Sequence, residues 1–191
     1  MREQRKSVIR EWVESIIIAF ILAMIIRTFI VQAFKIPTGS MRPTLMEGDI
    51  ILVNKFIYGA KIPFTQWRLP ALRPPKRGDV IVFIYPENPT KDFIKRLVAF
   101  PGERVEIKNG TVYINDKPLL DPEFSSRYYY NRGELGQEGE KIIVPKDSFF
   151  VLGDNSASSQ DSRYWGFLPY KNLLGKAFLI YWPPQRIRII K

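Results

Sequence analysis

The longest apolar segment of the chain lies near its N-terminus, from Val13 to Ala33. Its centre is the uninterrupted run IIIAFILAMII from Ile16 to Ile26, and Glu14 and Arg27 lie close to its two ends. At about 1.5 Å per residue, a helix over this segment is about 30 Å long, which is enough to cross the hydrocarbon core of a bilayer. The pattern therefore predicts one transmembrane helix over residues 13–33.

The charges on the two sides of this helix predict its orientation. Only Lys35 and Arg42 follow it closely, whereas four basic residues precede it: Arg2, Arg5, Lys6 and Arg10. Positive charge is preferentially retained on the cytoplasmic side of a membrane. We therefore expect a single-pass protein of the cell membrane, with residues 1–12 in the cytoplasm and residues 34–191 outside it.

A cleaved secretory signal is the alternative interpretation of the same segment. A basic start, a short apolar run and the small-x-small tripeptide VQA at Val31–Ala33 are typical of such signals. Arg27 argues against this alternative, because it would lie between the apolar run and the cut.

From Lys35 onward, short apolar runs rich in Val, Ile, Phe and Tyr are bounded by Gly, Pro and Asp. This pattern is typical of strands, and the runs are DIILVNKFIYG, DVIVFIYP, DFIKRLVAFPG, SFFVLGD and KAFLIYWPP. Asn109 and Gly110 stand between two alternating runs, the strongest short hairpin signal in the chain. We expect a mainly β fold: an antiparallel β-sheet domain over residues 34–191, with a small inserted β subdomain at about residues 104–146.

One proline-rich segment, Ala60 to Gly78, is expected to be a loop rather than a strand. Its apolar side chains Phe64, Trp67 and Leu69 have the composition of a membrane-interface contact, although ordinary packing explains them equally well.

Composition narrows the chemistry of the protein. The chain has no cysteine and no histidine, which removes disulfides, thiolate nucleophiles and the usual ligands of zinc. We expect no metal and no cofactor. The formal net charge of +10 fits a lipid bilayer better than nucleic acid, because no nucleic-acid-binding motif accompanies it.

One serine has the setting of a nucleophile. Ser40 follows a glycine in the turn IPTGSMRPTL, but a serine nucleophile needs a base and no histidine exists. A lysine can serve if burial keeps it neutral. Two lysines lie in strand-like runs with apolar neighbours on their own face: Lys95 and Lys55. Strand periodicity does not choose between them. For any lysine of this kind, the usual expectation is that it lies at the end of a strand with its amine in solvent.

Four ordered stretches resemble the motif boxes of the type I (bacterial leader) signal peptidases. They are FKIPTGSMRPTLMEGDIILVNK, RGDVIVF, DFIKRLVAFPGE and GDNSASSQDSRYWGFLP, and they extend from about Phe34 to Pro169. The resemblance implies a Ser/Lys dyad, with Ser40 as nucleophile and Lys95 as general base. It also implies an oxyanion hole made by the backbone N–H of Ser40 and the hydroxyl of Thr38.

The same resemblance assigns a supporting role to the last box. It implies that Ser159 hydrogen-bonds the Lys95 amine and that Asp154, Asp161 and Arg163 form a polar network beneath the site. The box departs from the common family pattern, because Ser156, Ala157 and Ser158 stand where an arginine and its neighbours are usual. The departure places the stability of this loop in question rather than the chemistry.

By resemblance, the substrates are exported preproteins with signal peptides, cut after small residues in an Ala-x-Ala pattern. Residues flanking the dyad would wall the substrate pockets: Phe34, Ile36, Phe93 and Ile94. Two other functions remain open. One is a different Ser/Lys peptidase of this fold, such as a self-cleaving repressor, and the other is an anchored β domain that binds secreted proteins without catalysis.

Overall fold

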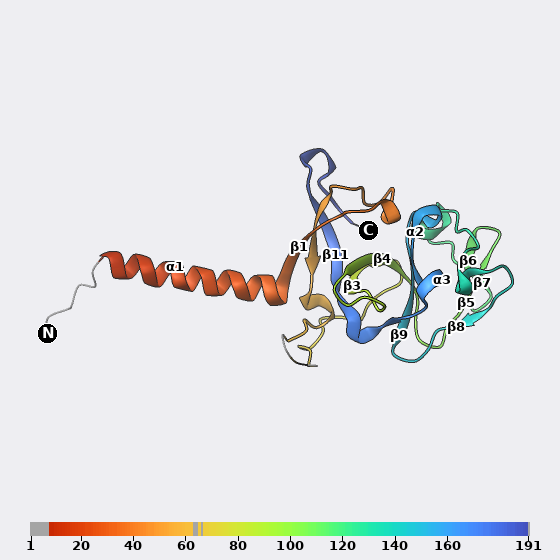
Figure 1. Ribbon diagram of the computed structural model, residues 1–191, viewed down its shortest axis with the longest axis horizontal. Helices are drawn as coiled ribbons and strands as arrows, with labels where there is room; N and C mark the ends of the chain where they lie inside the picture. Colours follow the sequence, from red (N-terminus) through yellow and green to blue (C-terminus); the bar gives the residue numbers. More distant parts are fainter. Residues whose placement is uncertain (1–7, 63–64, 66, 191) are drawn as a thin grey trace.

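The computed structural model describes residues 8–62, 65 and 67–190. The basic residues Arg2, Arg5 and Lys6, and the side chain of Phe64, to which the sequence drew attention, lie outside this range. A long N-terminal helix projects from a β-rich body, and the smaller of two sheets lies at the far end of that body (Figure 1). The mainly antiparallel β fold predicted from the sequence is confirmed.

The N-terminal helix is the one helix among the described residues that is long and apolar enough to cross a membrane. Helix α1 covers Val8–Ile25 and continues as a π-helical segment over Ile26–Ile30. The predicted end at Ala33 is wrong, because Val31–Lys35 form strand β1. Backbone pairing explains the difference: β1 pairs with β2, and the N–H of Lys55 donates to the carbonyl of Ile30 at 2.9 Å. Apolar character alone does not separate such a strand from the end of a helix.

The larger sheet has the strand order β1-β2-β11-β3-β4-β9-β10, with β12 paired to β11, and all its pairs are antiparallel. Its remaining strands are β2 Ile50–Asn54, β3 Val80–Ile84, β4 Asp92–Ala99, β9 Ser148–Leu152, β10 Leu168–Pro169, β11 Leu173–Trp182 and β12 Arg188–Ile189. The central strands β3 and β9 are buried except at one end residue each, and β4 is buried from Lys95 to Ala99. These strands supply the rigid base on which the site is built.

Strand β2 ends earlier than its apolar pattern predicted. The predicted run continued past Lys55, but the strand stops at Asn54 and a 3₁₀ turn follows over Phe56–Tyr58. The side-chain oxygen of Asn54 accepts the N–H of Ile57 at 2.9 Å. Such a local side-chain bond offers the backbone an alternative to the sheet ladder. Lys55 therefore lies beyond the strand.

The smaller sheet has the order β7-β6-β5-β8 and lies within the range where a subdomain was predicted. Its strands are β5 Arg104–Lys108, β6 Thr111–Ile114, β7 Lys117–Pro118 and β8 Ile142–Ile143. The β5–β6 hairpin is confirmed, and Asn109 and Gly110 at its turn both have positive φ. Its apolar face shares one core with β4 and β9, since Val105 and Ile107 cluster with buried residues of both strands. The two sheets are therefore joined by a continuous core.

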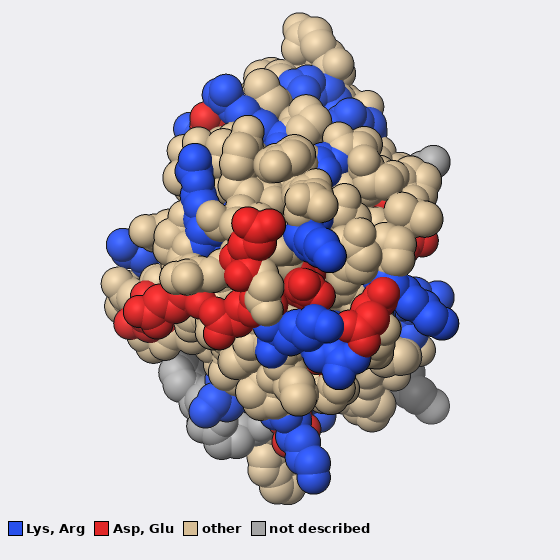
Figure 2. Space-filling model, turned by 90° about the vertical axis from the view of Figure 1, so that its right-hand side faces the viewer, with Lys and Arg blue, Asp and Glu red and all other residues tan. Residues whose placement is uncertain are grey.

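Short helical segments complete the fold. They are α2 Pro122–Ser125, α3 Ser162–Trp165 and 3₁₀ turns over Gly39–Met41, Glu134–Gly136, Ser156–Ser158, Tyr170–Asn172 and Pro184–Arg186. The face at the end remote from α1 carries both signs of charge, with acidic side chains gathered near its middle (Figure 2). Lys141, for example, pairs with Asp116 at 3.0 Å. The basic excess of the chain does not form one continuous patch on this face.

Candidate active site

Ser40 lies in the 3₁₀ turn Gly39–Met41, which follows the extended residue Thr38. Its neighbour Met41 is fully buried, and so is Leu45, whose N–H donates to the carbonyl of Met41 at 2.9 Å. This apolar anchoring holds the turn against the body of the protein. Ser40 itself is only 6% exposed.

Lys95 lies in the middle of β4, opposite Ile81 of β3. Its amine nitrogen Nζ lies 2.8 Å from Oγ of Ser40, although 55 positions separate the two residues in the chain. Nζ also lies 3.0 Å from the carbonyl oxygen of Ile94 and 5.3 Å from the ring centroid of Phe93. The side chain of Lys95 is thus enclosed, with a residue exposure of 4%.

Burial lowers the pKa of Lys95 from its ordinary value near 10.5 to about 8. Desolvation is the largest cause, because it penalises the charged amine. The carboxylates of Asp161 and Asp154 oppose the shift, and the guanidinium of Arg163 reinforces it. With this pKa, about a tenth of the amine is neutral at pH 7 and about half at pH 8. The neutral form is the one that can accept a proton from Ser40.

Lys55, the other lysine that the sequence left open, lies elsewhere. Its Nζ donates to the side-chain oxygen of Gln32 at 3.2 Å. Burial lowers the pKa of Lys55 as well, while the carboxylate of Asp92 raises it and the charge of Arg27 lowers it. The lowered pKa alone does not distinguish the two lysines, but the position beside Ser40 does.

A cavity of about 240 Å³ opens beside the Ser40–Lys95 pair. It is lined by Pro37, Thr38, Ser40, Asp92, Phe93, Ile94, Lys95, Ser158 and Gln160. A smaller cavity of about 40 Å³ lies against the same strand and is lined by all four predicted wall residues, which are Phe34, Ile36, Phe93 and Ile94. The structure thus gathers Thr38, the serine, the lysine and the four apolar wall residues around two adjoining spaces.

Asp161 and Arg163 form the polar network that the sequence predicted for them. Both side chains are fully buried, with Nε of Arg163 2.8 Å from Oδ1 of Asp161. Oδ2 of Asp161 accepts the N–H of Gly153 at 2.9 Å. The pair therefore ties α3 to the end of β9 beneath the site.

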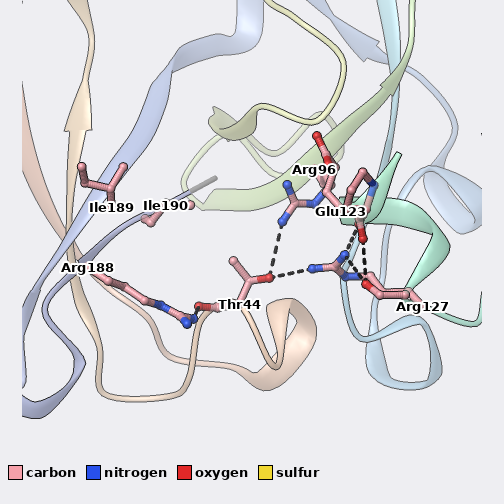
Figure 3. Close-up of a pocket in the computed structure, with 9 residues that line it drawn as sticks. Thr44, Arg96, Glu123, Arg127, Arg188, Ile189 and Ile190 are labelled. Atoms are coloured by element: carbon pink, nitrogen blue, oxygen red, sulfur yellow. Dashed lines mark hydrogen bonds between the residues drawn. The ribbon is translucent and has the colours of Figure 1, made fainter. Parts of the chain in front are cut away.

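Asp154 belongs to a second network rather than to that of Asp161. Arg96 binds it through two contacts of 2.7 Å, and both side chains are almost fully buried. Nη2 of Arg127 lies 3.1 Å from Oδ2 of Asp154, and the Thr44 hydroxyl donates to the same carboxylate. Figure 3 shows Thr44 between the guanidiniums of Arg96 and Arg127, which come from β4 and from the segment after α2.

The predicted hydrogen bond between Ser159 and the Lys95 amine is wrong for this structure. Among the described residues, Oγ of Ser159 has no hydrogen-bond partner although it is buried. Packing explains its position, because Ser159 lies tightly against Gly153: a methyl group added to that glycine would lie 2.1 Å from Oγ of Ser159 and 2.6 Å from the carbonyl oxygen of Ser40. No side chain fits between β9 and the Ser40 turn at this position.

The unusual residues Ser156 and Ala157 are held by partners that the sequence did not indicate. Oγ of Ser156 accepts from Nη1 of Arg163 at 2.7 Å and from the N–H of Tyr130 at 2.8 Å. Arg132 donates to the carbonyl of Ala157 at 2.8 Å. Arg163 and Arg132 thus stabilise this loop, although neither stands at the position where the family usually has an arginine.

Three residues that sequence reasoning missed take part in the arrangement: Arg96, Arg127 and Asn155. The pair Lys95–Arg96 contained a usable signal. Successive residues of a strand point to opposite faces. If Lys95 faces the site from a central strand, the side chain of Arg96 must therefore be buried on the opposite face. A buried arginine requires a carboxylate partner, and Asp154 is that partner. Arg127 and Asn155 carried no comparable signal.

The described residues contain no group of three or more His, Cys, Asp or Glu side chains placed to hold a metal ion. The chemistry that the arrangement itself offers is a serine hydroxyl against a partly neutral amine, beside a cavity with an apolar wall.

Comparison with known proteins gives consistent matches. A family model described as signal peptidase, peptidase S26, matches residues 9–182. A signal peptidase I of Pseudomonas aeruginosa is 32% identical over 217 residues, covering 96% of this chain and 76% of that protein. A probable signal peptidase I-2 of Synechocystis sp. is 37% identical over 191 residues, covering 94% and 77% respectively. The crystal structure of a signal peptidase I from Enterococcus faecalis V583 covers 56% of this chain and 98% of that chain, at 34% identity and a TM-score of 0.47.

The close packing at Gly153 generates a prediction. Gly153→Ala should lower the free energy of unfolding by about 1–3 kcal/mol, because the added methyl group overlaps Ser159 and a backbone carbonyl that cannot move freely. Thermal unfolding of the detergent-solubilised protein measures the change. Gly39→Ala is the matched control, since its methyl group meets only the exposed side chains of Arg42 and Glu47. Equal stability of the two variants would contradict the packing argument.

Proposed function

The chain belongs to the signal peptidase family, peptidase S26, and from this premise we propose that it is a membrane-anchored serine endopeptidase that removes signal peptides from exported preproteins. Membership of the family supports a peptidase that acts on signal peptides. The observation that carries the mechanism is the 2.8 Å contact between Nζ of Lys95 and Oγ of Ser40 in a buried setting. The two residues form the proposed catalytic dyad.

The short distance between Nζ of Lys95 and Oγ of Ser40 supports a route for proton transfer within the proposed dyad. Neutral Lys95 takes the hydroxyl proton of Ser40 as Oγ attacks the scissile carbonyl carbon. Lys95 then returns the proton to the leaving amine, and the C–N bond breaks to give the acyl-enzyme. In the second half, Lys95 takes a proton from water, whose oxygen attacks the ester, and returns it to Oγ of Ser40 as the product leaves.

The developing oxyanion needs donors that are already in place. The proposed donors are the backbone N–H of Ser40 and the hydroxyl of Thr38, and both residues line the cavity beside the dyad. The side chain of Thr38 makes no capping bond to the 3₁₀ turn that follows it. Its hydroxyl is therefore not committed to stabilising that turn.

The substrate is proposed to bind as an added strand. Strand β9 pairs with β4 only from Arg96 onward, whereas β3 pairs with the whole of Asp92–Arg96. The first half of β4 thus has an unpaired edge beside the cavity. An extended peptide can add to such an edge and place alternate side chains in pockets. The small apolar spaces walled by Phe34, Ile36 and Ile94 favour alanine-sized side chains, consistent with Ala-x-Ala sites.

The N-terminal helix supplies the proposed membrane anchor. No residue of the hydrophobic segment Val8–Ile30 is fully buried against the rest of the protein, so most of its apolar surface is available to lipid. Strand β1 connects it directly to the Ser40 region. Following the charge distribution, the N-terminus is cytoplasmic and the peptidase domain is extracytoplasmic, where the cleavage site of a membrane-inserted signal peptide emerges.

Cleavage of a synthetic peptide with an Ala-x-Ala site tests the dyad. The detergent-solubilised wild type should cut after the second alanine, and Ser40→Ala and Lys95→Ala should lose activity, because each removes one member of the dyad. Lys55→Ala should cut at nearly the wild-type rate, as its amine contacts Gln32 instead. Mass spectrometry of the products measures both site and rate. A Lys95→Ala variant as active as wild type would refute the mechanism.

Thr38→Val tests the second oxyanion donor. Valine keeps the shape of threonine without the hydroxyl, so turnover should fall by roughly 10²-fold or more, the scale for one lost oxyanion-hole donor. Steady-state kinetics with the same peptide measures the loss, and Thr90→Val, at an exposed turn, is the control. A near-normal rate would exclude Thr38 from the mechanism.

The lowered pKa of Lys95 predicts the pH dependence of the reaction. Only the neutral amine accepts the proton, so kcat/KM should rise with pH, reach half its maximum near pH 8 and level off about one pH unit higher. Well below that value the rise should be about tenfold per pH unit. Lys55→Ala should leave the midpoint unchanged. A midpoint near 10, the range of a solvated lysine, would show that burial does not tune this group.

A further inference from the structure

Asn155 makes two hydrogen bonds to the turn that carries Ser40. Its backbone N–H donates to the carbonyl of Ser40 at 3.0 Å, and its side-chain amide Nδ2 donates to the carbonyl of Gly39 at 3.0 Å. The second bond is notable because the carbonyl of Gly39 belongs to the same peptide unit as the N–H of Ser40. That N–H is the proposed backbone donor to the oxyanion.

Because the peptide unit is planar, a hydrogen bond to its carbonyl also determines the direction of its N–H. The Gly39–Ser40 peptide bond is not among the cis bonds of the structure, so its C=O and N–H point in opposite directions. Fixing the carbonyl of Gly39 therefore fixes the direction of the N–H of Ser40. The N–H of Arg42 also donates to this carbonyl, at 3.1 Å, but Arg42 is the C-cap of the same 3₁₀ turn, so this bond is local to the turn.

Asn155 and Ser40, which lie on the two sides of this peptide unit, line different cavities. Asn155 does not line the cavity beside the dyad; it lines a separate one, together with Arg42 and Pro43. Ser40 and Thr38 line the cavity beside the dyad. An N–H that points away from Asn155 therefore points towards the space in which the scissile carbonyl would lie.

Resting on the proposed function, we infer that Asn155 is a positioning residue: its side-chain amide holds the Gly39–Ser40 peptide unit so that the N–H of Ser40 faces the oxyanion. Without this bond, the carbonyl of Gly39 retains just the local bond from the N–H of Arg42, so the peptide unit has more freedom to rotate and turn its carbonyl towards the cavity. A carbonyl oxygen there would repel the oxyanion instead of stabilising it. Asn155 acts through Ser40 and does not itself touch the substrate.

Asn155 is well suited to this task because its own segment is anchored at each residue. The N–H of Gly153 donates to Asp161, and the carboxylate of Asp154 is bound by Arg96 and Arg127. The carbonyl of Asn155 accepts the N–H of Ser158 at 3.0 Å. The segment Gly153–Asn155 is thus held in place on both sides, and through Asn155 it fixes the orientation of the Ser40 turn.

The expected effect is a selective loss of transition-state stabilisation. Asn155→Ala should lower kcat about 10- to 100-fold, somewhat less than the 10²–10³-fold for outright removal of an oxyanion donor, because the N–H of Ser40 remains present. KM should stay within about twofold, since the pockets are unchanged. The pH midpoint of kcat/KM should remain near 8, because the surroundings of Lys95 are not altered.

A pair of inhibitors separates orientation of the oxyanion donor from general damage to the fold. A substrate-sequence peptide aldehyde adds Oγ of Ser40 to its carbonyl carbon, and the proton passes through Lys95, so that the resulting hemiacetal oxygen occupies the oxyanion position. The same peptide with a reduced scissile amide has no such oxygen. Asn155→Ala should lose about 10- to 100-fold in affinity for the aldehyde and bind the reduced peptide as the wild type does.

Two further variants complete the design. Asn155→Asp keeps the side-chain shape but replaces the donor with an acceptor facing the carbonyl of Gly39, so it should lose at least as much as Asn155→Ala. Asn172→Ala is the matched control, because Nδ2 of Asn172 donates to the carbonyl of Ile84 at the same 3.0 Å distance, away from the cavity. It should retain both affinities. Thermal unfolding confirms that each variant is folded.

The outcomes are distinguishable. If the wild type cuts the peptide but the Asn155 variants keep their affinity for the aldehyde, the positioning role of Asn155 is overturned and the proposed function stands. The same conclusion holds if these variants lose affinity for the aldehyde and for the reduced peptide equally. A wild-type protein that neither cuts nor binds the aldehyde overturns the proposed function, and this inference with it.

Discussion

The structure depends above all on keeping the amine of Lys95 buried beside Ser40, with its pKa lowered far enough that it can lose its proton near neutral pH. Burial lowers the pKa of this amine, while the two nearby carboxylates of Asp161 and Asp154 act in the opposite direction and favour its charged form. Each of them is bound to an arginine: Asp161 to Arg163, and Asp154 to Arg96. The charge of Arg163 favours the neutral amine directly. The buried ion pairs therefore stabilise the fold around the lysine while limiting the negative field that would protonate it.

The same ion pairs also help to hold Lys95 and Ser40 together. Lys95 comes from a central strand, which fixes its direction, whereas Ser40 comes from a short turn. The segment Gly153–Asn155 lies between them. Asp154 holds β4 through Arg96, and Asn155 holds the turn through two backbone carbonyls. Gly153 allows the close approach, because no side chain fits at that point.

Under the proposed function, the junction between helix and sheet determines where catalysis occurs. The helix does not end in a flexible linker: Ile30 is bonded to Lys55, and β1 pairs with β2 from its first residue. The predicted wall residue Phe34 lies on this same strand. A rigid connection of this kind keeps the cavity close to the end of the apolar helix, where a membrane-inserted substrate would present its cleavage site.

The sequence by itself determined the features that depend on local patterns. The apolar N-terminal run, the strand-like runs of the β body and the Asn109–Gly110 hairpin follow from side-chain periodicity and backbone preference. The ordered motif boxes indicated the family, which the comparisons confirm, and they pointed to Ser40 and Lys95 as the proposed dyad.

Tertiary structure decided the features that depend on contacts between distant segments. Periodicity left Lys55 and Lys95 equivalent, and only the pairing of β4 with β3 and the packing of the Ser40 turn placed one of them at 2.8 Å from the serine. The early end of the helix, the partners of Asp154 and the unpaired hydroxyl of Ser159 likewise arise from sheet pairing and close packing. Such contacts join residues far apart in the chain, so no local pattern encodes them.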